Sequence, residues 1–251
     1  MNARLLKIRS DPSLVAGAFD LEDQHGDRWL TLVVKVTFDV APGRCTLAVR
    51  QERVAFGVEP APNGPPEDDL PPKPRAEVLV LGHAYAPGGK ATKELVARIS
   101  VEAFQKAILV VGDRYFDEAG RLSAPKPFLS MGIGLDRAAG GPRSANPIGV
   151  SPGPLGTSVR LPNLFPPGFV PSRPDEAIPI ATLGPIPPWF PARRDKLGAV
   201  DGAARWRDVP PGKVAPAFFQ TALPDQRVAA LAPDARVRLE NLHPLHRVEI
   251  L

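Results

Sequence analysis

Alternating hydrophobic and polar residues predict β-strands in the first part of the chain. Residues 29–40 give the clearest pattern, with these apolar side chains on one face: Leu30, Leu32, Val34, Val36, Phe38 and Val40. This period of two is typical of a strand with one buried side. Residues 14–20 are predicted to pair with this strand across a turn at residues 23–27. A turn at residues 41–44 leads into a return strand that begins with Cys45, Leu47 and Val49, so we expect a β-meander.

Residues 76–104 combine a continuous apolar run, a turn and an alternating run. The unbroken apolar residues 78–81 predict a strand covered on both faces. A turn is expected at residues 87–90, because proline presets φ and glycine permits positive φ. The alternating run places these residues on one face: Leu95, Ala97, Ile99, Val101 and Ala103. The simplest interpretation is the central hairpin of a β domain, followed by a strand at residues 106–116 that ends or bulges at Gly112 and Asp113.

From residue 125 the chain consists of short apolar pieces separated by proline and glycine. Large aromatic residues in this half indicate burial rather than disorder: Trp189, Phe190, Trp206, Phe218 and Phe219. Trp189 in particular is expected to be buried. We expect short helices near residues 191–206 and 214–220, and late strands at residues 235–239 and at the C-terminal end.

Together these patterns predict one mainly β domain over residues 1–251. Residues 1–124 are expected to form a β-meander core, within which the strands of residues 14–116 pack as an antiparallel β-sandwich-like structure. Residues 125–251 are expected to form an irregular, Pro/Gly-rich packed shell with late strands and few short helices. The 32 prolines among 251 residues support this view, because proline breaks helix interiors.

The amino-acid composition limits the cellular compartment and the kinds of partner that we expect. The single cysteine, Cys45, excludes an internal disulfide and a zinc site built from cysteines. The N-terminus has no apolar segment typical of a signal peptide, and no apolar run is long enough to span a membrane. We therefore expect a cytoplasmic protein without a membrane partner. The formal net charge is +4, but Lys and Arg are scattered, so no nucleic-acid partner is expected.

No arrangement of residues typical of an enzyme or a metal site stands out. His83 would need a positioned partner such as Asp113 to act as a catalyst, and a structural histidine is favoured. His243 and His246 have a spacing that suits a metal on a helix, but Pro244 argues against a helix there. The glycine pairs match neither phosphate-binding pattern, and no nucleophile elbow is present. We predict no catalytic, cofactor-binding or metal-binding residues, and hence no enzyme.

Six or more short pieces, in order, resemble domain-of-unknown-function family 2169, which is encoded beside type VI secretion genes in Gram-negative bacteria. The first is the segment VLVLGHAYAPGGK at residues 78–90. The others are these: Asp136-Arg137-Ala138-Ala139-Gly140-Gly141, Asn146-Pro147-Ile148-Gly149, Leu161-Pro162-Asn163-Leu164, Gly184-Pro185-Ile186-Pro187-Pro188-Trp189, Pro191-Ala192-Arg193, and the region from Phe218-Phe219 to Ala222-Leu223-Pro224-Asp225-Gln226. Ala139, where an aromatic residue is usual, and Leu223 depart from the family's pattern.

The resemblance implies a type VI secretion accessory protein. Members of the family resemble adaptors or chaperones that hold a secreted effector, or the PAAR-type spike-tip protein that carries it, before loading on the spike. No catalytic residues of the family can be carried over. We expect the partner to contact the glycine-rich turns near residues 82–90 and 140–149, where a chain can approach closely. The expected contact residues are Gly82, His83, Tyr85, Pro87, Gly88, Gly89, Arg137, Gly140, Gly141 and Asn146.

Two alternatives are a hydrolase or lyase with an unrecognised site, and a structural component of the secretion machine. A deep pocket with convergent polar groups would favour the enzyme. A broad apolar groove or an open sheet edge would favour the adaptor. Self-assembly of the purified protein would favour the structural component.

Overall fold

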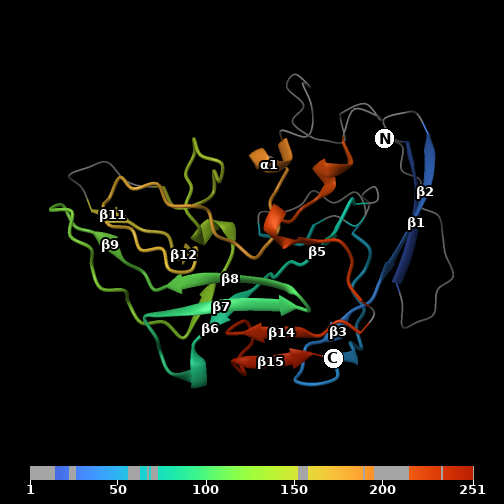
Figure 1. The fold of residues 1–251 in the computed structure, drawn as a ribbon, viewed down its shortest axis with the longest axis horizontal. Coiled ribbons are helices and arrows are strands. Elements are labelled where there is room, and N and C mark those ends of the chain that lie inside the picture. Colours follow the sequence, from blue (N-terminus) through green and yellow to red (C-terminus); the bar gives the residue numbers. More distant parts are fainter. Residues whose placement is uncertain are drawn as a thin grey trace. The chain divides into compact units, whose positions relative to one another are not determined.

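The computed structural model describes residues 15–22, 27–55, 63–66, 68, 73–151, 158–188, 190–194, 215–232 and 234–250 (Figure 1). Over these residues the chain is mainly β, its strands pair antiparallel, and the helices are short. The predicted fold class is therefore confirmed. None of the helices within these ranges has the length and apolar character needed to span a membrane.

The chain folds into two compact units, each made of two segments. Unit 1 comprises residues 1–78 and 186–231, and unit 2 comprises residues 79–185 and 232–251. The units do not follow the predicted boundary at residue 124, and the single domain over residues 1–251 stays a prediction.

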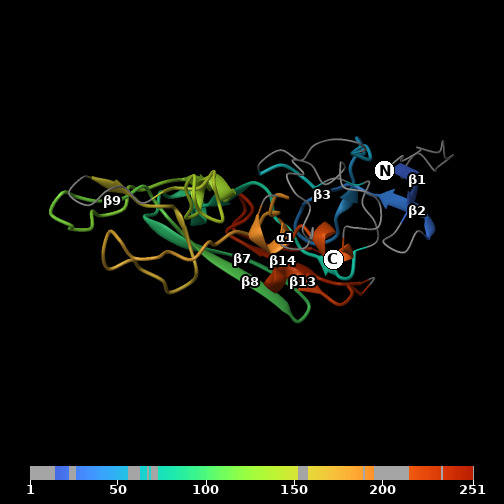
Figure 2. The same ribbon diagram turned by 90° about the horizontal axis from the view of Figure 1, so that it is seen from above.

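Unit 2 contains a five-stranded antiparallel sheet with the order β12-β8-β7-β14-β15. Its strands are β7 (Glu94–Val101), β8 (Phe104–Val111), β12 (Leu164–Phe165), β14 (Val237–Glu240) and β15 (Arg247–Ile250). Figures 1 and 2 both show β7 and β8 running side by side as the long central pair. Three of the five strands come from the second half of the chain, so the prediction that the strands of residues 14–116 alone form the core is wrong.

The alternating pattern of β7 is confirmed. Leu95, Ala97, Ile99 and Val101 are all buried, and the residues between them are half-buried. On the opposite side of the sheet, the Glu240 carboxylate forms ion pairs with Arg98 at 3.2 Å and with Arg247 at 3.1 Å. With paired strands on both sides and one packed face, β7 is the centre of the unit 2 core.

The predicted central hairpin is wrong. Strand β6 (His83–Tyr85) pairs with β10 (Ser130–Gly132), not with β7. Residues 78–81 lie outside the regular strands, and the backbone N–H of Val80 donates to the carbonyl of Leu183 at 2.9 Å. A three-residue strand carries too little alternation to identify its partner, which lies more than forty residues away along the chain.

The break predicted at Gly112 and Asp113 is confirmed, because β8 ends at Val111 and β9 (Tyr115–Phe116) follows. Strand β9 pairs with β11 (Val159–Arg160). Phe116, Val159 and Leu161 form a buried cluster with Ile178 packed against it. The second half of the chain therefore contributes core residues, as its aromatic and aliphatic content predicted.

Among its described residues, unit 1 contains three two-stranded antiparallel pairs. They are β1 (Val15–Glu22) with β2 (Arg28–Lys35), β3 (Phe38–Asp39) with β4 (Thr46–Leu47), and β5 (Ala76–Glu77) with β13 (Arg227–Val228). The predicted pairing of the first two strands is present, but the single strand predicted over residues 29–40 is divided into β2 and β3, and the two pairs belong to separate sheets. Gly43, in the turn between β3 and β4, has φ of 81°, a conformation that favours glycine.

The short helices described in unit 1 are α1 (Pro191–Arg194), η4 (Pro216–Phe219) and η5 (Pro224–Gln226). Helices α1 and η4 lie within the predicted ranges 191–206 and 214–220, whereas η5 was not predicted; residues 195–206 lie outside the described residues. Phe190, Phe218 and Phe219 are buried, which supports a packed second half. Trp189, which is predicted to be buried, and Trp206 both lie outside the described residues.

Candidate functional site

The first predicted contact group, at residues 82–89, lies on an exposed strand and turn of unit 2. Gly82 and His83 are exposed, and the His83 and Tyr85 rings are 6.3 Å apart. The backbone N–H of Tyr85 donates to the carbonyl of Asn241 at 2.8 Å. The turn η1 (Pro87–Gly89) is fully exposed, with φ of 60° at Gly88 and 66° at Gly89. This group is accessible to a partner, and its role in binding stays a prediction.

The second predicted contact group is built into the loop that follows η2 (Leu135–Arg137). Asn146 is buried and its side-chain amide donates to the carbonyls of Leu135 at 2.7 Å and Ala139 at 3.0 Å. A Cβ at Gly140 would stand 2.1 Å from the Asn146 carbonyl oxygen. Gly141 is buried with φ of 129°. These residues hold the loop together, which gives them a structural role whatever the partner.

Asn163 links Arg137 to the end of the large sheet. Its side-chain amide donates to the carbonyl of Val111 at 2.9 Å and to Asp113 Oδ1 at 3.1 Å, and its Oδ1 accepts from Arg137 Nη1 at 3.2 Å. Arg160 Nη2 lies 3.5 Å from Asp113 Oδ1. The hydrogen bond from Asn163 lowers the pKa of Asp113, the charges of Arg160 and Arg137 add to this, and partial burial opposes it. Asp113 thus belongs to this cluster, not to a catalytic pair with His83.

A pocket of about 340 Å³ adjoins this loop in unit 2. Its wall is largely apolar and includes Leu161, Ile178 and Ile180. Gly140 is the one predicted contact residue in the lining, which also holds these polar residues: Ser144, Arg160, Asp175 and Glu176.

The polar groups of this pocket are engaged with their own surroundings. Ser144 Oγ donates to the Asn146 carbonyl at 3.1 Å, and Asp175 pairs with Arg173 at 3.3 Å. The backbone N–H of Ser172 donates to Glu176 at 2.6 Å and thereby lowers the pKa of Glu176. A general acid needs the opposite shift near neutral pH. The pocket can accommodate an apolar group, and the pKa of Glu176 is shifted away from the range that a general acid needs.

Arg114 is a buried cation in unit 2 that the sequence did not single out. Its guanidinium carbon lies 5.0 Å from the centre of the Phe165 ring, and burial lowers its pKa. Its Nε and Nη2 atoms are buried without a hydrogen-bond partner among the described residues. An arginine in a short strand connection has no pattern that would mark it in advance.

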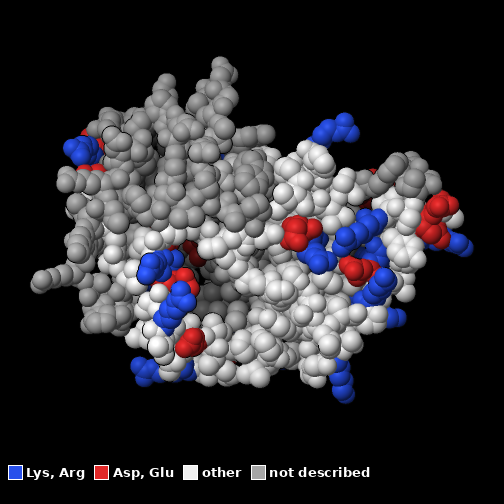
Figure 3. Space-filling model, turned by 180° about the vertical axis from the view of Figure 1, so that it is seen from behind, with Lys and Arg blue, Asp and Glu red and all other residues white. Residues whose placement is uncertain are grey.

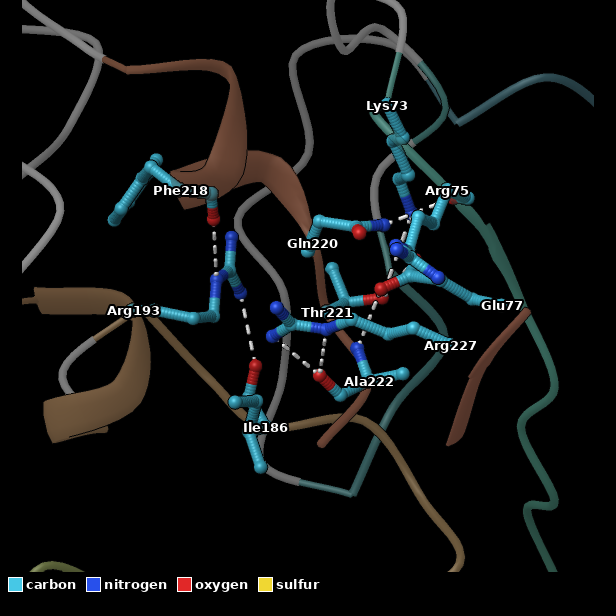
Figure 4. A network of polar contacts seen from close by, with 10 residues as sticks. All are labelled: Lys73, Arg75, Glu77, Ile186, Arg193, Phe218, Gln220, Thr221, Ala222 and Arg227. Carbon is cyan, nitrogen blue, oxygen red and sulfur yellow. Dashed lines mark hydrogen bonds and ion pairs between the residues drawn. The ribbon is translucent and has the colours of Figure 1, made fainter. Parts of the chain in front are cut away.

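Unit 1 contains a network of polar contacts with two centres, Arg193 and Glu77, of which Arg193 belongs to a family-like piece (Figure 4). Arg193 is almost completely buried, donates to the carbonyls of Phe218 and Ile186 at 2.9 Å each, and stacks over the Phe218 ring. Figure 4 shows its guanidinium between these two carbonyls. Arg193 therefore joins α1, η4 and the segment at Ile186.

Glu77, at the end of β5, forms the second centre of this network. Its carboxylate accepts hydrogen bonds from Lys73 Nζ, from Thr221 Oγ1 at 3.1 Å and from the Ala222 N–H at 2.6 Å. Arg227 donates to the Ala222 carbonyl at 2.9 Å and 2.7 Å. Figure 4 shows the Glu77 and Arg227 side chains meeting at the backbone of Ala222. These contacts satisfy both backbone groups of Ala222 in an irregular segment, which gives the arrangement a structural role.

Charged side chains of both signs lie next to one another on the face drawn in Figure 3. The described residues also include ion pairs between exposed side chains, such as Arg238 with Glu249 at 3.5 Å. This mixed pattern agrees with the scattered charges of the sequence.

Several large apolar side chains of unit 1 are exposed, against expectation. Seven large apolar residues expose at least 46% of their surface, and we call them the apolar face: Leu30, Leu32, Val34, Phe38, Val40, Leu47 and Val49. Those on β2 lie opposite β1 residues that include Ala16 and Ala18, and Phe38 lies opposite Leu47. The predicted alternation is seen in β2, where Leu30, Leu32 and Val34 are more exposed than Thr31 and Val33, but the expected burial of the apolar residues is wrong.

Comparison with known proteins identifies a matching protein family. A family model described as "Uncharacterized protein conserved in bacteria (DUF2169)" matches residues 25–250. No curated protein and no solved structure matches the chain.

Proposed function

The chain belongs to the DUF2169 family of uncharacterized bacterial proteins, and we propose that it is a type VI secretion accessory protein. In this proposal it acts in the cytoplasm as an adaptor or chaperone. It binds a secreted effector, or a PAAR-type spike-tip protein, before loading on the spike. The proposal rests on the ordered family-like pieces of the sequence and on one structural observation.

That observation is the apolar face of unit 1. Exposed apolar patches on a folded protein mark protein or membrane interaction sites or ligand-binding grooves. The seven members lie within a stretch of twenty residues; Leu30, Leu32 and Val34 alternate along β2, and Phe38 lies opposite Leu47 in the pair β3–β4. A surface of this kind suits the binding of a protein rather than the chemical conversion of a small molecule.

The second candidate is a hydrolase or lyase, and the pocket of about 340 Å³ in unit 2 is the observation that favours it. Its volume lies at the lower end of the ~300–1,000 Å³ range of small-molecule sites. The adaptor is the better-supported function, because Ser144 and Glu176 are held in hydrogen bonds to their own loops. A structural role in the secretion machine is the third candidate and requires self-assembly.

Co-purification from the native host tests the proposal. Tagged protein is expressed at its natural level, captured, and analysed by mass spectrometry beside an untagged strain. We expect the neighbouring effector or a PAAR-type protein to be enriched in near-equal amount with the tagged chain. Capture of the tagged protein alone, or of copies of itself in large assemblies, would contradict the adaptor function.

A further inference from the structure

One wall of the pocket in unit 2 is an extended segment, residues 177–180. Ala177 and Pro179 are exposed, and Ile178 and Ile180, which alternate with them, are half-buried. This alternation is typical of extended backbone. Ala177, Ile178 and Ile180 all line the pocket of about 340 Å³. The pocket therefore lies along an extended stretch of main chain.

Side-chain packing holds this segment in place, and main-chain hydrogen bonds do not. Ile178 packs against the buried cluster of Phe116, Val159 and Leu161. By contrast, the N–H and C=O groups of residues 177–180 form no hydrogen bond with any residue that the structure describes. An extended segment with unpaired main-chain groups is a template on which another chain can pair. Because packing already holds the segment in place, pairing with it costs little conformational entropy.

One edge of the segment is better suited to pairing than the other. In extended backbone, the N–H and C=O groups of a residue and of the residue two positions on point to the same edge. Ile178 and Ile180 therefore supply both donors and acceptors to one edge. Pro179 has no N–H, so the opposite edge lacks a donor there. A partner strand is expected on the edge of Ile178 and Ile180.

The groups around the pocket favour a peptide over a small molecule. The polar side chains of the lining are paired within unit 2, as follows: Ser144 with Asn146, Arg160 with Asp113, Asp175 with Arg173 and Glu176 with Ser172. Small-molecule sites orient their ligands with a few convergent polar groups. The unpaired groups here are main-chain groups in a row along the segment, an arrangement that an extended peptide matches.

We propose that this site binds an extended segment of the partner protein, which pairs its main chain with Ile178 and Ile180 and places a large apolar side chain in the pocket. In such strand addition, main-chain hydrogen bonds supply affinity and the pocket selects the side chain. This inference rests on the proposed function and names where and how the adaptor holds its partner. It does not depend on the apolar face, which lies in unit 1.

Binding of peptides to the purified full chain tests the pocket. The probes are short overlapping peptides that cover the neighbouring effector and PAAR-type proteins, and fluorescence anisotropy measures their affinity. We expect a peptide with a large apolar residue to bind. Ala145→Phe fills the pocket from its wall and should weaken this binding by about tenfold or more, as the loss of a buried anchor does. Ala107→Phe is the matched control, because Ala107 is half-buried like Ala145 but lies on β8 outside the lining, and it should stay within about twofold.

Two proline substitutions test the main-chain contacts. Ile180→Pro removes an N–H from the proposed ladder, and Ala177→Pro removes one from the opposite edge. Neither N–H bonds to a described residue in the free protein, so neither change breaks a hydrogen bond of the described fold. We expect Ile180→Pro to weaken peptide binding by about tenfold and Ala177→Pro to stay within about twofold, because only the first removes a ladder donor. Equal effects of the two would overturn the pairing.

Amide hydrogen exchange provides a readout that needs no variant. NMR spectroscopy compares exchange rates in the free chain and in the chain saturated with the bound peptide. We expect the amides of Ile178 and Ile180 to exchange about tenfold more slowly or less in the complex, and the amide of Ala177 to change little. Unchanged exchange at Ile178 and Ile180 would overturn the inference, even where a variant fails to fold.

Separate outcomes distinguish this inference from the proposed function. If the wild type binds neither the intact effector nor the PAAR-type protein, the adaptor is contradicted and the inference falls with it. If the intact partner binds the wild type, Ala145→Phe and Ile180→Pro equally well, the inference is overturned and the adaptor stands. A wild-type dimer that Ala145→Phe converts to a monomer assigns the pocket to a second copy. A small molecule that co-purifies with the wild type but not with Ala145→Phe assigns it to a ligand, and either result overturns the inference.

Discussion

At the scale of single residues, buried polar side chains hold the irregular backbone of the second half together. Asn146, Asn163 and Arg193 each donate to two or more groups of the surrounding chain, most of them main-chain carbonyls. Buried carbonyls outside helices and sheets still need donors, and these side chains supply them. All three lie in family-like pieces of the sequence. Three of the family-like pieces therefore contain a residue with a structural role.

Arg193→Met tests this role directly. The substitution keeps an apolar side chain of similar length but leaves the carbonyls of Phe218 and Ile186 without their charged donor. Since hydrogen bonds to charged groups contribute roughly 1.5–3 kcal/mol each, we expect a loss of about 3 kcal/mol in the free energy of unfolding. Urea denaturation measures it. Arg121→Met, at an exposed surface ion pair, is the control and should change little.

Asp113 should make stability depend on pH. Its pKa is lowered in the folded protein, chiefly by the hydrogen bond from Asn163. A lowered folded-state pKa gives stability that is present above the unfolded value of about 4 and is lost as pH falls through the folded value. We therefore expect Asp113→Asn to be less stable than the wild type at pH 7, with a gap that closes below about pH 4. A gap at pH 3 that is as large as, or larger than, the gap at pH 7 would contradict this assignment.

At the scale of elements, periodicity predicted strands well and their partners poorly. The alternation in residues 95–101 correctly identified β7 and its buried face. Strand β7 is paired on both sides and one of its faces packs on the core, so its apolar residues are confined to that face. The same alternation in residues 29–40 identified β2 and β3 but not their exposure. A period of two says which residues share a face, and it does not say what covers that face. Strand β6 is too short for its pairing with β10 to be visible in the sequence.

Two turn positions require glycine for different reasons: Gly140 because a Cβ would clash, and Gly88 because of its backbone conformation. A Cβ at Gly140 would meet the Asn146 carbonyl oxygen at 2.1 Å, whereas Gly88 has open space but φ of 60°. We expect Gly140→Ala to destabilise the protein by about 2 kcal/mol or more through forced displacement. Gly88→Ala should cost about 1 kcal/mol through the left-handed conformation alone. Thermal unfolding of both variants measures the order, and a larger effect at Gly88 would contradict the packing of this loop.

At the scale of the whole molecule, the sequence identified the mainly β class and the family, but not the surface on which the proposed function depends. The predicted contact residues form two groups. Residues such as His83 and Gly88 are exposed, whereas residues such as Asn146 and Gly141 are buried and have a structural role in their loop. The resemblance alone could not separate the two, because a motif records which residues recur and not whether they pack or bind. The apolar face lies within residues 30–49. The sequence pattern there shows which side chains are apolar, but it does not show which part of the chain packs against them.

Deletion of the gene in its native host tests the central claim most directly. The amount of the neighbouring effector in cells and in the medium is measured in the deletion strain, in the parent, and in a strain complemented with the wild-type gene. We predict that the effector fails to accumulate or to be exported while the secretion tube still fires, and that the wild-type gene restores it. Unchanged effector level and export in the deletion strain would contradict the adaptor function and return the enzyme hypothesis to first place.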